Sequence, residues 1–291
     1  MLKHLNIINQ SIFHAFICVC IDLGIIPDAW KKATVYLIPK PKPFFVSLTN
    51  TRPITLLETP RKAFISLLNK RLNAMIKQHN VLRGHQFAAL PGNSTFEPLR
   101  IINEILQDAN KSNNELWLLS QDLGKAYDRV NIFMLEKAMS RLKISSSFTR
   151  IITSLFKNRT NQVITTYGLT DPYEVIIGID QEEVISPLLW YIYYDPLLCE
   201  VESRKLGYTI NTPSISLNDN PSDHFNQVEE DSLTISSIAF MNDTQWLAPN
   251  KPNLESILKI ADSFYRLTDI QVNKEKSSLL LRKKILDKSK L

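Results

Sequence analysis

Glycine is scarce in this sequence: there are seven glycines in 291 residues, and none lies in a GxxxxGK or GxGxxG arrangement. Phosphate-cradling loops of the P-loop and Rossmann types are therefore excluded. HExxH and GxSxG patterns are also absent. Their absence excludes the local signatures of zinc proteases and of hydrolases with a nucleophile elbow.

Cysteines and long apolar runs are also few. Cys18, Cys20 and Cys199 form no CxxC pair and have no histidine array nearby, so we expect neither a disulfide framework nor a structural zinc site, and we expect a reducing intracellular compartment. The most apolar early stretch, Ile12–Ile26, is interrupted by polar residues and is too short to cross a bilayer. We therefore expect no membrane partner and no cleavable signal sequence.

Charge is segregated along the chain, although the net charge is only +5. Ten Lys or Arg residues and one acid, Glu58, lie between positions 30 and 80, and seven basic residues and two acids lie between 271 and the end. The stretch 201–243 has seven acids and two bases. Such blocks favour a polyanionic partner, although solvated helix faces would give the same pattern.

Hydrophobic periodicity predicts helices interleaved with short strands, without a regular βαβ alternation, which indicates an α+β fold. Helices are expected over residues 2–26, 60–79, 95–109, 132–142, 148–156, 187–202 and 254–267. Strands are expected over 35–38, 116–120, 161–167, 173–179, 235–240, 244–248 and 277–282. In the helix over 60–79 the polar face is expected to carry the basic residues Arg61, Lys62, Lys70, Arg71 and Lys77. The polar stretch 211–230 predicts a surface loop or a disordered insertion.

The residues with the most chemical information are carboxylates at chain reversals. Asp122 follows a predicted strand, and Asn242-Asp243 lies in a predicted hairpin turn. Nucleotidyl transfer to a 3′-hydroxyl uses two divalent cations, and Mg²⁺ needs only one or two protein carboxylates besides substrate phosphates. A lone Asp in such a place is usually a turn or cap residue, so the ordered set of motifs carries the interpretation.

That set resembles the reverse transcriptases of non-LTR retrotransposons, with six motifs in the family's order over roughly residues 27–282. The first motif is Arg52–Ile54 with Asn69–Leu72, preceded by the upstream-strand segments Trp30–Ala33 and Ile38–Lys40. The other five are His85–Phe87 with Gly92–Thr95, Asp122–Asp128 (DLGKAYD), Gln181–Leu189 (QEEVISPLL), Phe240–Asp243 (FMND) and Asp269–Lys276.

The resemblance implies a right-hand polymerase with fingers and a ferredoxin-like palm sheet. It implies RNA-directed DNA polymerase activity on an RNA template with a DNA primer and a dNTP, two Mg²⁺ ions, and a nuclear location. The predicted regions are an N-terminal helical extension over 1–29, mostly fingers over 30–112, mostly palm over 113–282 with a polar insertion over 207–232, and a basic tail over 283–291. We expect the thumb to be absent.

Site roles also follow from the resemblance. Asp122 would bind both metals, with the Leu123 carbonyl as an accessory ligand, and Asn242 and Asp243 occupy the hairpin box that supplies the other catalytic carboxylate.

Four further residues would contact the substrate. Lys40 and Arg52 would contact the triphosphate, for which Arg is suited by its forked geometry, and Gln181 would contact the nucleotide. Tyr127 would exclude a 2′-hydroxyl, which disfavours an RNA-dependent RNA polymerase. The alternatives are that Lys40 and Arg52 are plain surface cations and that Tyr127 is a half-buried core aromatic. For Ser186, in the same motif as Gln181, the alternative is a helix cap.

Two departures from the family pattern predict impaired catalysis. Asn242 replaces the first Asp of the hairpin box, and Glu182 replaces a glycine, followed by a second acid, Glu183. Alternation along a strand predicts that Asp243 points to the other face. A catalytically inactive nucleic-acid-binding remnant, and a gene fragment without a selected role, therefore remain as alternatives.

Overall fold

The computed structural model describes residues 6–41, 47–90, 92, 94–213 and 230–284. The described chain forms two compact units, each built from two stretches: Met1–Leu82 with Lys125–Tyr193, and Arg83–Gly124 with Tyr194–Leu291. Within these described ranges, no helix has the length and apolar character needed to cross a membrane.

Helices of the first unit begin and end where the sequence supplies caps. Helix α1 (Ile7–Leu23) starts at Asn6, whose side chain accepts a hydrogen bond from the Asn9 amide, and ends at Gly24, which has a φ of 65°. A glycine is suited to this left-handed position because it has no Cβ. Helix α2 (Thr59–His79) has a proline in its first turn, where a missing N–H costs nothing.

The sheet of the first unit has the strand order β2-β1-β4-β5, and β6 also pairs with β4. Strands β1 and β2 are antiparallel, whereas β1 and β4 are parallel. The strand bounds are Lys32–Pro39 for β1, Thr51–Leu56 for β2, Arg159–Thr165 for β4, Gly168–Leu169 for β5 and Tyr173–Val175 for β6. The remaining helical elements of this unit are η2 (Asp28–Lys31), η3 (Leu48–Asn50), η4 (Tyr127–Arg129), α4 (Ile132–Arg141) and α5 (Ser146–Ser154).

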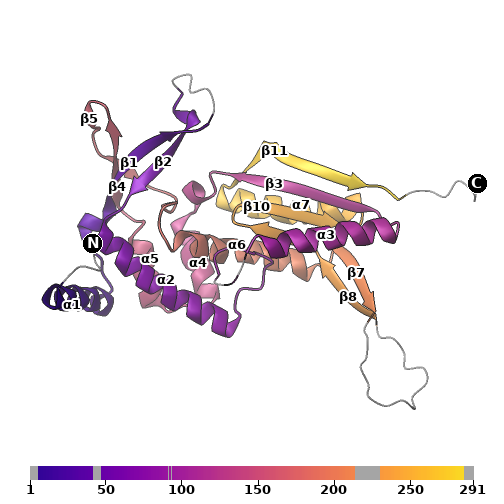
Figure 1. Cartoon of the computed structure of the whole chain (residues 1–291), viewed down its shortest axis with the longest axis horizontal. Coiled ribbons are helices and arrows are strands. Elements are labelled where there is room, and N and C mark those ends of the chain that lie inside the picture. Colours follow the sequence, from indigo (N-terminus) through magenta and orange to yellow (C-terminus); the bar gives the residue numbers. More distant parts are fainter. Residues whose placement is uncertain (1–5, 42–46, 91, 93, 214–229, 285–291) are drawn as a thin grey trace, which may run out of the picture. The chain divides into compact units, whose positions relative to one another are not determined.

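The second unit contains a four-stranded antiparallel sheet with the order β11-β3-β10-β9, and its neighbouring strands can be followed in Figure 1. The bounds are Leu116–Gly124 for β3, Ser237–Phe240 for β9, Asp243–Ala248 for β10 and Gln271–Arg282 for β11. One face of this sheet packs on helix α3 (Phe96–Lys111), where Ile105 belongs to the same buried cluster as Leu118 and Leu247. Apolar residues therefore occupy one end of this face, and the opposite end of the face is left for polar residues.

Two further elements complete the second unit. Strands β7 (Tyr208–Pro213) and β8 (Glu230–Ile235) form an antiparallel ribbon, and helix α7 (Lys251–Thr268) packs on β10. Helix α6 (Ser186–Ser203) contributes residues to both units.

The predicted α+β fold is confirmed, and most predicted elements are present, with ends that shift by a few residues. Strand β3 continues to Gly124, so Asp122 lies inside the strand and not after it. The ends of the predicted insertion form β7 and β8, whereas residues 214–229 and the end of the predicted basic tail lie outside the described residues. The fingers and palm boundaries stay a prediction.

Candidate active site

Asp122 and Asp243 lie directly opposite each other on the antiparallel strands β3 and β10. Residues paired in this way project from the same face of a sheet, so the two carboxylates share one face, at the end away from α3. The prediction that Asp243 points to the other face is therefore wrong. Alternation was counted from Asn242, but Asn242 lies in the turn, and the strand begins at Asp243.

The turn that precedes Asp243 is held by a buried glutamine. Met241 has a φ of 57°, a left-handed conformation that is unfavourable for a residue with a Cβ. The Gln86 side chain, only 4% exposed, donates from Nε2 to the Met241 carbonyl at 2.9 Å and accepts from the Met241 amide at 2.8 Å. This pair of hydrogen bonds fixes the backbone conformation at the hairpin tip.

Asn242 contacts the backbone of the neighbouring strand. Its Nδ2 donates to the Leu123 carbonyl at 3.3 Å. That carbonyl is the oxygen predicted as an accessory metal ligand, and a carboxylate at position 242 could not donate to it. The substitution therefore removes a negative charge and also engages an oxygen that a cation would need.

The charge around the carboxylate pair is partly balanced by a lysine. Lys276 Nζ lies 3.4 Å from Asp122 Oδ2. Lys276 is on strand β11, where the register against β3 shifts between Asn273 and Ser278. The pKa of Asp243 is raised above its ordinary value by partial burial and by the negative charge of Asp122. A cation between the two carboxylates would relieve this repulsion.

Behind the carboxylates, on the opposite face of the sheet, buried polar side chains join β3 and β10 to two helices. Gln121 Oε1 accepts hydrogen bonds from Trp246 Nε1 at 3.0 Å and from the Tyr265 hydroxyl at 2.7 Å. Tyr265 also shares a hydrogen bond of 2.8 Å with the Tyr194 hydroxyl, which contacts Thr244 Oγ1 at 3.2 Å. Because Gln121 precedes Asp122 and Thr244 follows Asp243, this network holds the two strands in register beside the carboxylates.

The donors at this site fit a hard cation. They are two carboxylates with nearby carbonyl and amide oxygens, which suit Mg²⁺. No cluster of three or more His, Cys, Asp or Glu residues suited to a metal occurs among the described residues, so the carboxylates number only two. The set is sufficient for one Mg²⁺ completed by substrate phosphates, and it is weak for a second ion.

The predicted substrate residues lie in the first unit, whereas the carboxylate pair lies in the second. On the β1–β2 ribbon, Ile38 pairs with Arg52, and the Lys40 amide donates to the Asn50 carbonyl at 2.8 Å. Strand β1 ends at Pro39, so Lys40 lies one residue beyond the strand, at the same end of the ribbon as Arg52.

Tyr127 and Gln181 lie on two segments of the first unit that hydrogen-bond to each other. The Ile179 amide donates to the Tyr127 carbonyl at 2.9 Å. Gly178 has a φ of 90°, and a Cβ there would lie 2.7 Å from the Asp128 carbonyl oxygen, so this close approach requires glycine. Gln181 is exposed, whereas Tyr127 is half-buried, and burial raises the pKa of its hydroxyl to about 12.

The loop that carries Gln181 is anchored by a buried ionic cluster, which we call the Arg61 cluster: Arg61, Arg159, Asp180 and Glu183. Arg61 donates to Glu183 Oε2 and to Asp180 Oδ2, both at 2.8 Å, and Arg159 donates to the other oxygen of Asp180. The Ser186 hydroxyl adds a bond of 2.6 Å to the Asp180 carbonyl.

Two predictions are corrected by this cluster. Arg61 is 1% exposed and does not lie on the polar face of its helix, and Glu183 is also 1% exposed and faces arginine, so it cannot repel a bound phosphate. Burial raises the pKa of Glu183 despite the neighbouring Arg61. A helix cap was one interpretation of Ser186. Its hydroxyl donates to the Asp180 carbonyl, which ties the loop to the start of α6. Glu182 remains partly exposed.

Sequence reasoning missed the supporting roles of Gln86, Arg61 and Lys276. Gln86 and Lys276 both lie inside segments that match the family's motifs, but the match assigned no role to either residue. For Arg61 there was no signal, because its partners lie 119 and 122 residues further along the chain.

Comparisons with known proteins agree with this geometry. The chain is 23% identical to the transposon TX1 uncharacterized 149 kDa protein of Xenopus laevis, over 92% of this chain and 19% of that protein. It is 25% identical to the retrovirus-related Pol polyprotein from the type-1 retrotransposable element R2 of Popillia japonica, over 87% of this chain and 32% of that protein. A probable RNA-directed DNA polymerase from transposon BS of Drosophila melanogaster is 29% identical over 60% of this chain and 19% of its own length. The chain thus spans a third or less of these relatives.

Solved structures show the same fold. Apo telomerase from Candida tropicalis, truncated from its C-terminal domain, superposes with a TM-score of 0.58 at 15% identity, covering 89% of this chain and 51% of that one. Telomerase from Candida albicans, in complex with a TWJ fragment of telomeric RNA, gives a TM-score of 0.57 at 12% identity, covering 90% and 44%. The right-hand polymerase fold predicted from the motifs is thereby confirmed.

The family itself follows from the sequence match. Residues 38–288 match the family described as reverse transcriptase (RNA-dependent DNA polymerase), a family that uses Mg²⁺, and the transposon relatives agree with the predicted non-LTR lineage. The chain belongs to the reverse transcriptase family.

Proposed function

We propose that this chain is the RNA-directed DNA polymerase domain of a non-LTR retrotransposon, and that its catalysis is impaired by Asn242 and Glu182. The observation that carries the proposal is the direct pairing of Asp122 with Asp243 at one end of the palm-like sheet. Membership of the reverse transcriptase (RNA-dependent DNA polymerase) family supports an RNA template for this chain. A nuclear location would follow from priming on chromosomal DNA.

In the proposed reaction the chain's own residues orient the substrates. Asp122 and Asp243 would hold Mg²⁺, which when bound activates the primer 3′-hydroxyl and stabilises the leaving pyrophosphate. Lys40 and Arg52, at one end of their ribbon, would neutralise the triphosphate. Gln181 would contact the nucleotide base or sugar from its anchored loop.

Tyr127 would select the sugar. Its ring lies 6.0 Å from that of Trp190, centroid to centroid, and this packing restricts the tyrosine to a narrow range of positions. A bulky ring held in this way beneath the incoming sugar leaves no room for a 2′-hydroxyl.

Impairment follows from charge at position 242. An amide there contributes no negative charge, and its Nδ2 is engaged with the Leu123 carbonyl. Loss of an electrostatic contact to the transition state typically costs about 3–4 kcal/mol, and each ~1.4 kcal/mol is tenfold in rate. We therefore expect the rate of primer extension to be lower by about 10²–10³ than with aspartate.

The hydrogen bond from Asn242 to the Leu123 carbonyl also favours a second function, which is binding of template and primer without catalysis. The basic residues between positions 30 and 80 supply the electrostatics. Binding of this kind weakens steeply as salt rises, and it would persist in variants of Asp122.

Primer extension on an RNA template with Mg²⁺ tests the proposal. The chain as it stands should extend slowly, Asn242→Asp combined with Glu182→Gly should extend faster, and Asp122→Asn should abolish extension in both backgrounds. Salt-dependent binding of the same template and primer should be equal in all variants. Extension at the same rate with and without Asp122 would refute the assignment of the site, and extension by the unmodified chain as fast as by Asn242→Asp would refute the impairment.

A further inference from the structure

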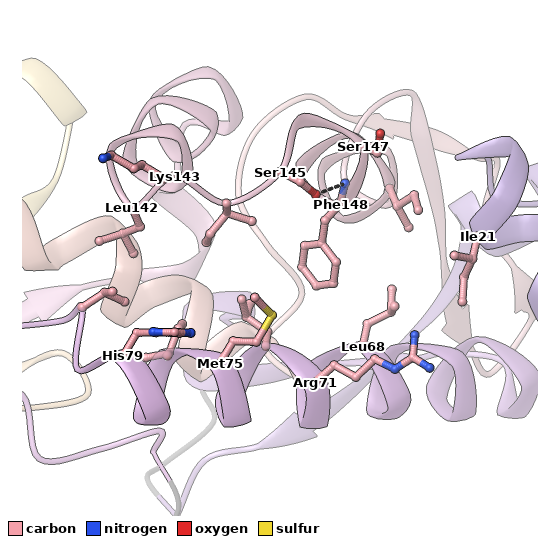
Figure 2. Close-up of a pocket in the computed structure, with 15 residues that line it drawn as sticks. Ile21, Leu68, Arg71, Met75, His79, Leu142, Lys143, Ser145, Ser147 and Phe148 are labelled. Atoms are coloured by element: carbon pink, nitrogen blue, oxygen red, sulfur yellow. Dashed lines mark hydrogen bonds between the residues drawn. The ribbon is translucent and has the colours of Figure 1, made fainter.

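A cavity of about 530 Å³ lies in the first unit, away from every residue assigned to the polymerase reaction. Helix α2 forms one wall, and the segment from the end of α4 into α5 forms the other, with Ile21 of α1 at one side (Figure 2). Its volume lies inside the range of about 300–1,000 Å³ that is usual for small-molecule sites.

The interior of this cavity is apolar. Leu68, Leu72, Ile76 and Ile151 line it, and each is at most 4% exposed. The ring of Phe148 projects from α5 toward α2 (Figure 2). An apolar chain or ring system placed against these side chains would have one side removed from water, and burial of apolar surface is the main source of affinity for such a ligand.

The charge at the cavity is of one sign. Among the described residues that line it, Arg71, His79 and Lys143 are basic and none is acidic. No ion pair of Arg71 occurs within the described part of the chain, so its guanidinium is available to a ligand. The first turn of α5 also faces the cavity through Ser147 and Phe148, and its partial positive charge adds to that of the side chains.

We propose that this cavity binds a small amphipathic anion, namely a medium-chain carboxylate whose apolar tail lies among the buried leucine and isoleucine side chains. The carboxylate would pair with the Arg71 guanidinium at the exposed edge of α2, since arginine matches the two oxygens of a carboxylate. The concave shape favours a small molecule, and the one-sided charge selects an anion over a neutral or cationic molecule of the same length.

Isothermal titration with decanoate, kept below the concentration at which it forms micelles, tests the proposal on the intact chain. We expect saturation at one molecule per chain. Decanol and decyltrimethylammonium, which share the tail but lack the anion, should bind at least about tenfold more weakly, as expected for loss of a charged hydrogen bond. Equal affinity for decanoate and decanol, or uptake without saturation, would overturn the proposal.

Variants locate the site. Arg71→Gln should weaken decanoate about tenfold or more and leave decanol unchanged, whereas Lys70→Gln, an exposed neighbour that does not line the cavity, should change neither. Met75→Trp should block both ligands, because Met75 is 60% exposed at the cavity wall and a larger ring can fill the space without disturbing the core. An unchanged melting temperature verifies folding for each variant. Equal losses in the Arg71 and Lys70 variants would refute the assignment, as would undiminished binding by Met75→Trp.

Discussion

Replacing Arg61 by methionine removes the centre of the Arg61 cluster. The guanidinium donates to the Trp30 carbonyl at 2.6 Å and to Asp180 and Glu183, each at 2.8 Å. Asp180 would keep Arg159 as a partner, but Glu183, at 1% exposure, would keep no cation. Removing one partner of a buried ion pair typically costs about 3–5 kcal/mol, and we expect a loss of unfolding free energy in that range.

Urea denaturation followed by tryptophan fluorescence measures this loss. The slope of free energy against urea should be unchanged, because a change in slope would indicate a different denatured or native state. Lys62→Met is the matched control: it removes an exposed cation one residue along the same helix, and it should lie within about 0.5 kcal/mol of the unmodified chain.

The pH dependence gives an independent check on Arg61→Met. Burial already raises the pKa of Glu183 above 4.5, and loss of Arg61 should raise it further. A carboxyl group whose pKa is raised in the folded state is best tolerated when protonated. Relative to the unmodified chain, the destabilisation should therefore be smallest at acid pH. It should grow as pH rises from the pKa of Glu183 in the folded unmodified chain to the higher pKa of Glu183 in the folded variant. Adding Glu183→Gln should restore part of the stability at neutral pH.

One result would refute this reasoning. If Arg61→Met and Lys62→Met had equal stability, the ion pairs of Arg61 would add no more stability than the apolar contacts of a methionine at the same position.

Two further predictions concern the second unit. Gln86→Ala should destabilise the chain by about 1–3 kcal/mol, because the Met241 amide and carbonyl lose their buried partner. It should also lower Mn²⁺ affinity measured by electron paramagnetic resonance, and unchanged affinity would show that the tip is held by other contacts. His85→Gln should cost stability mainly at low pH. The pKa of His85 is raised above 6.5 by its hydrogen bond to Glu202, so its contribution is complete below 6.5 and is lost as pH rises through the raised value. Thermal melting across that range should show the two chains converging, and a constant difference would contradict the assignment.

Local features of the fold were readable from sequence because their causes are local. The helix predicted over 60–79 differs from α2 by one residue at its start, since apolar spacing and Pro60 define it. The hairpin was predicted from two short apolar runs with Met241-Asn242-Asp243 as its tip, and the structure differs only in placing Asp243 in the second strand. The carboxylate at Asp122 was identified from its place beside a strand and from the ordered motifs around it.

Non-local features were not readable. The face to which Asp243 points depends on the residue at which β10 begins, and one position reverses the answer. The partner of Glu183 is Arg61 in helix α2, 122 residues earlier in the chain, and no pattern around position 183 distinguishes a buried carboxylate from an exposed one. The engagement of Asn242 with the Leu123 carbonyl depends on turn geometry that only the folded hairpin has.

The hydrogen bonds between Gln86 and Met241 at the hairpin tip affect how the chain folds. Gln86 and Met241 are separated by 155 residues, and β3 obtains both of its neighbours, β10 and β11, from the last third of the sequence. Contacts of such long range close slowly, because the loop entropy is lost before the contacts form. During synthesis the strand that bears Asp122 cannot pair with either neighbour until β10 and β11 have left the ribosome. The two carboxylates are therefore brought together only after β10 has emerged, and before that moment the unpaired edges of β3 are a point at which chaperones can act on the nascent protein.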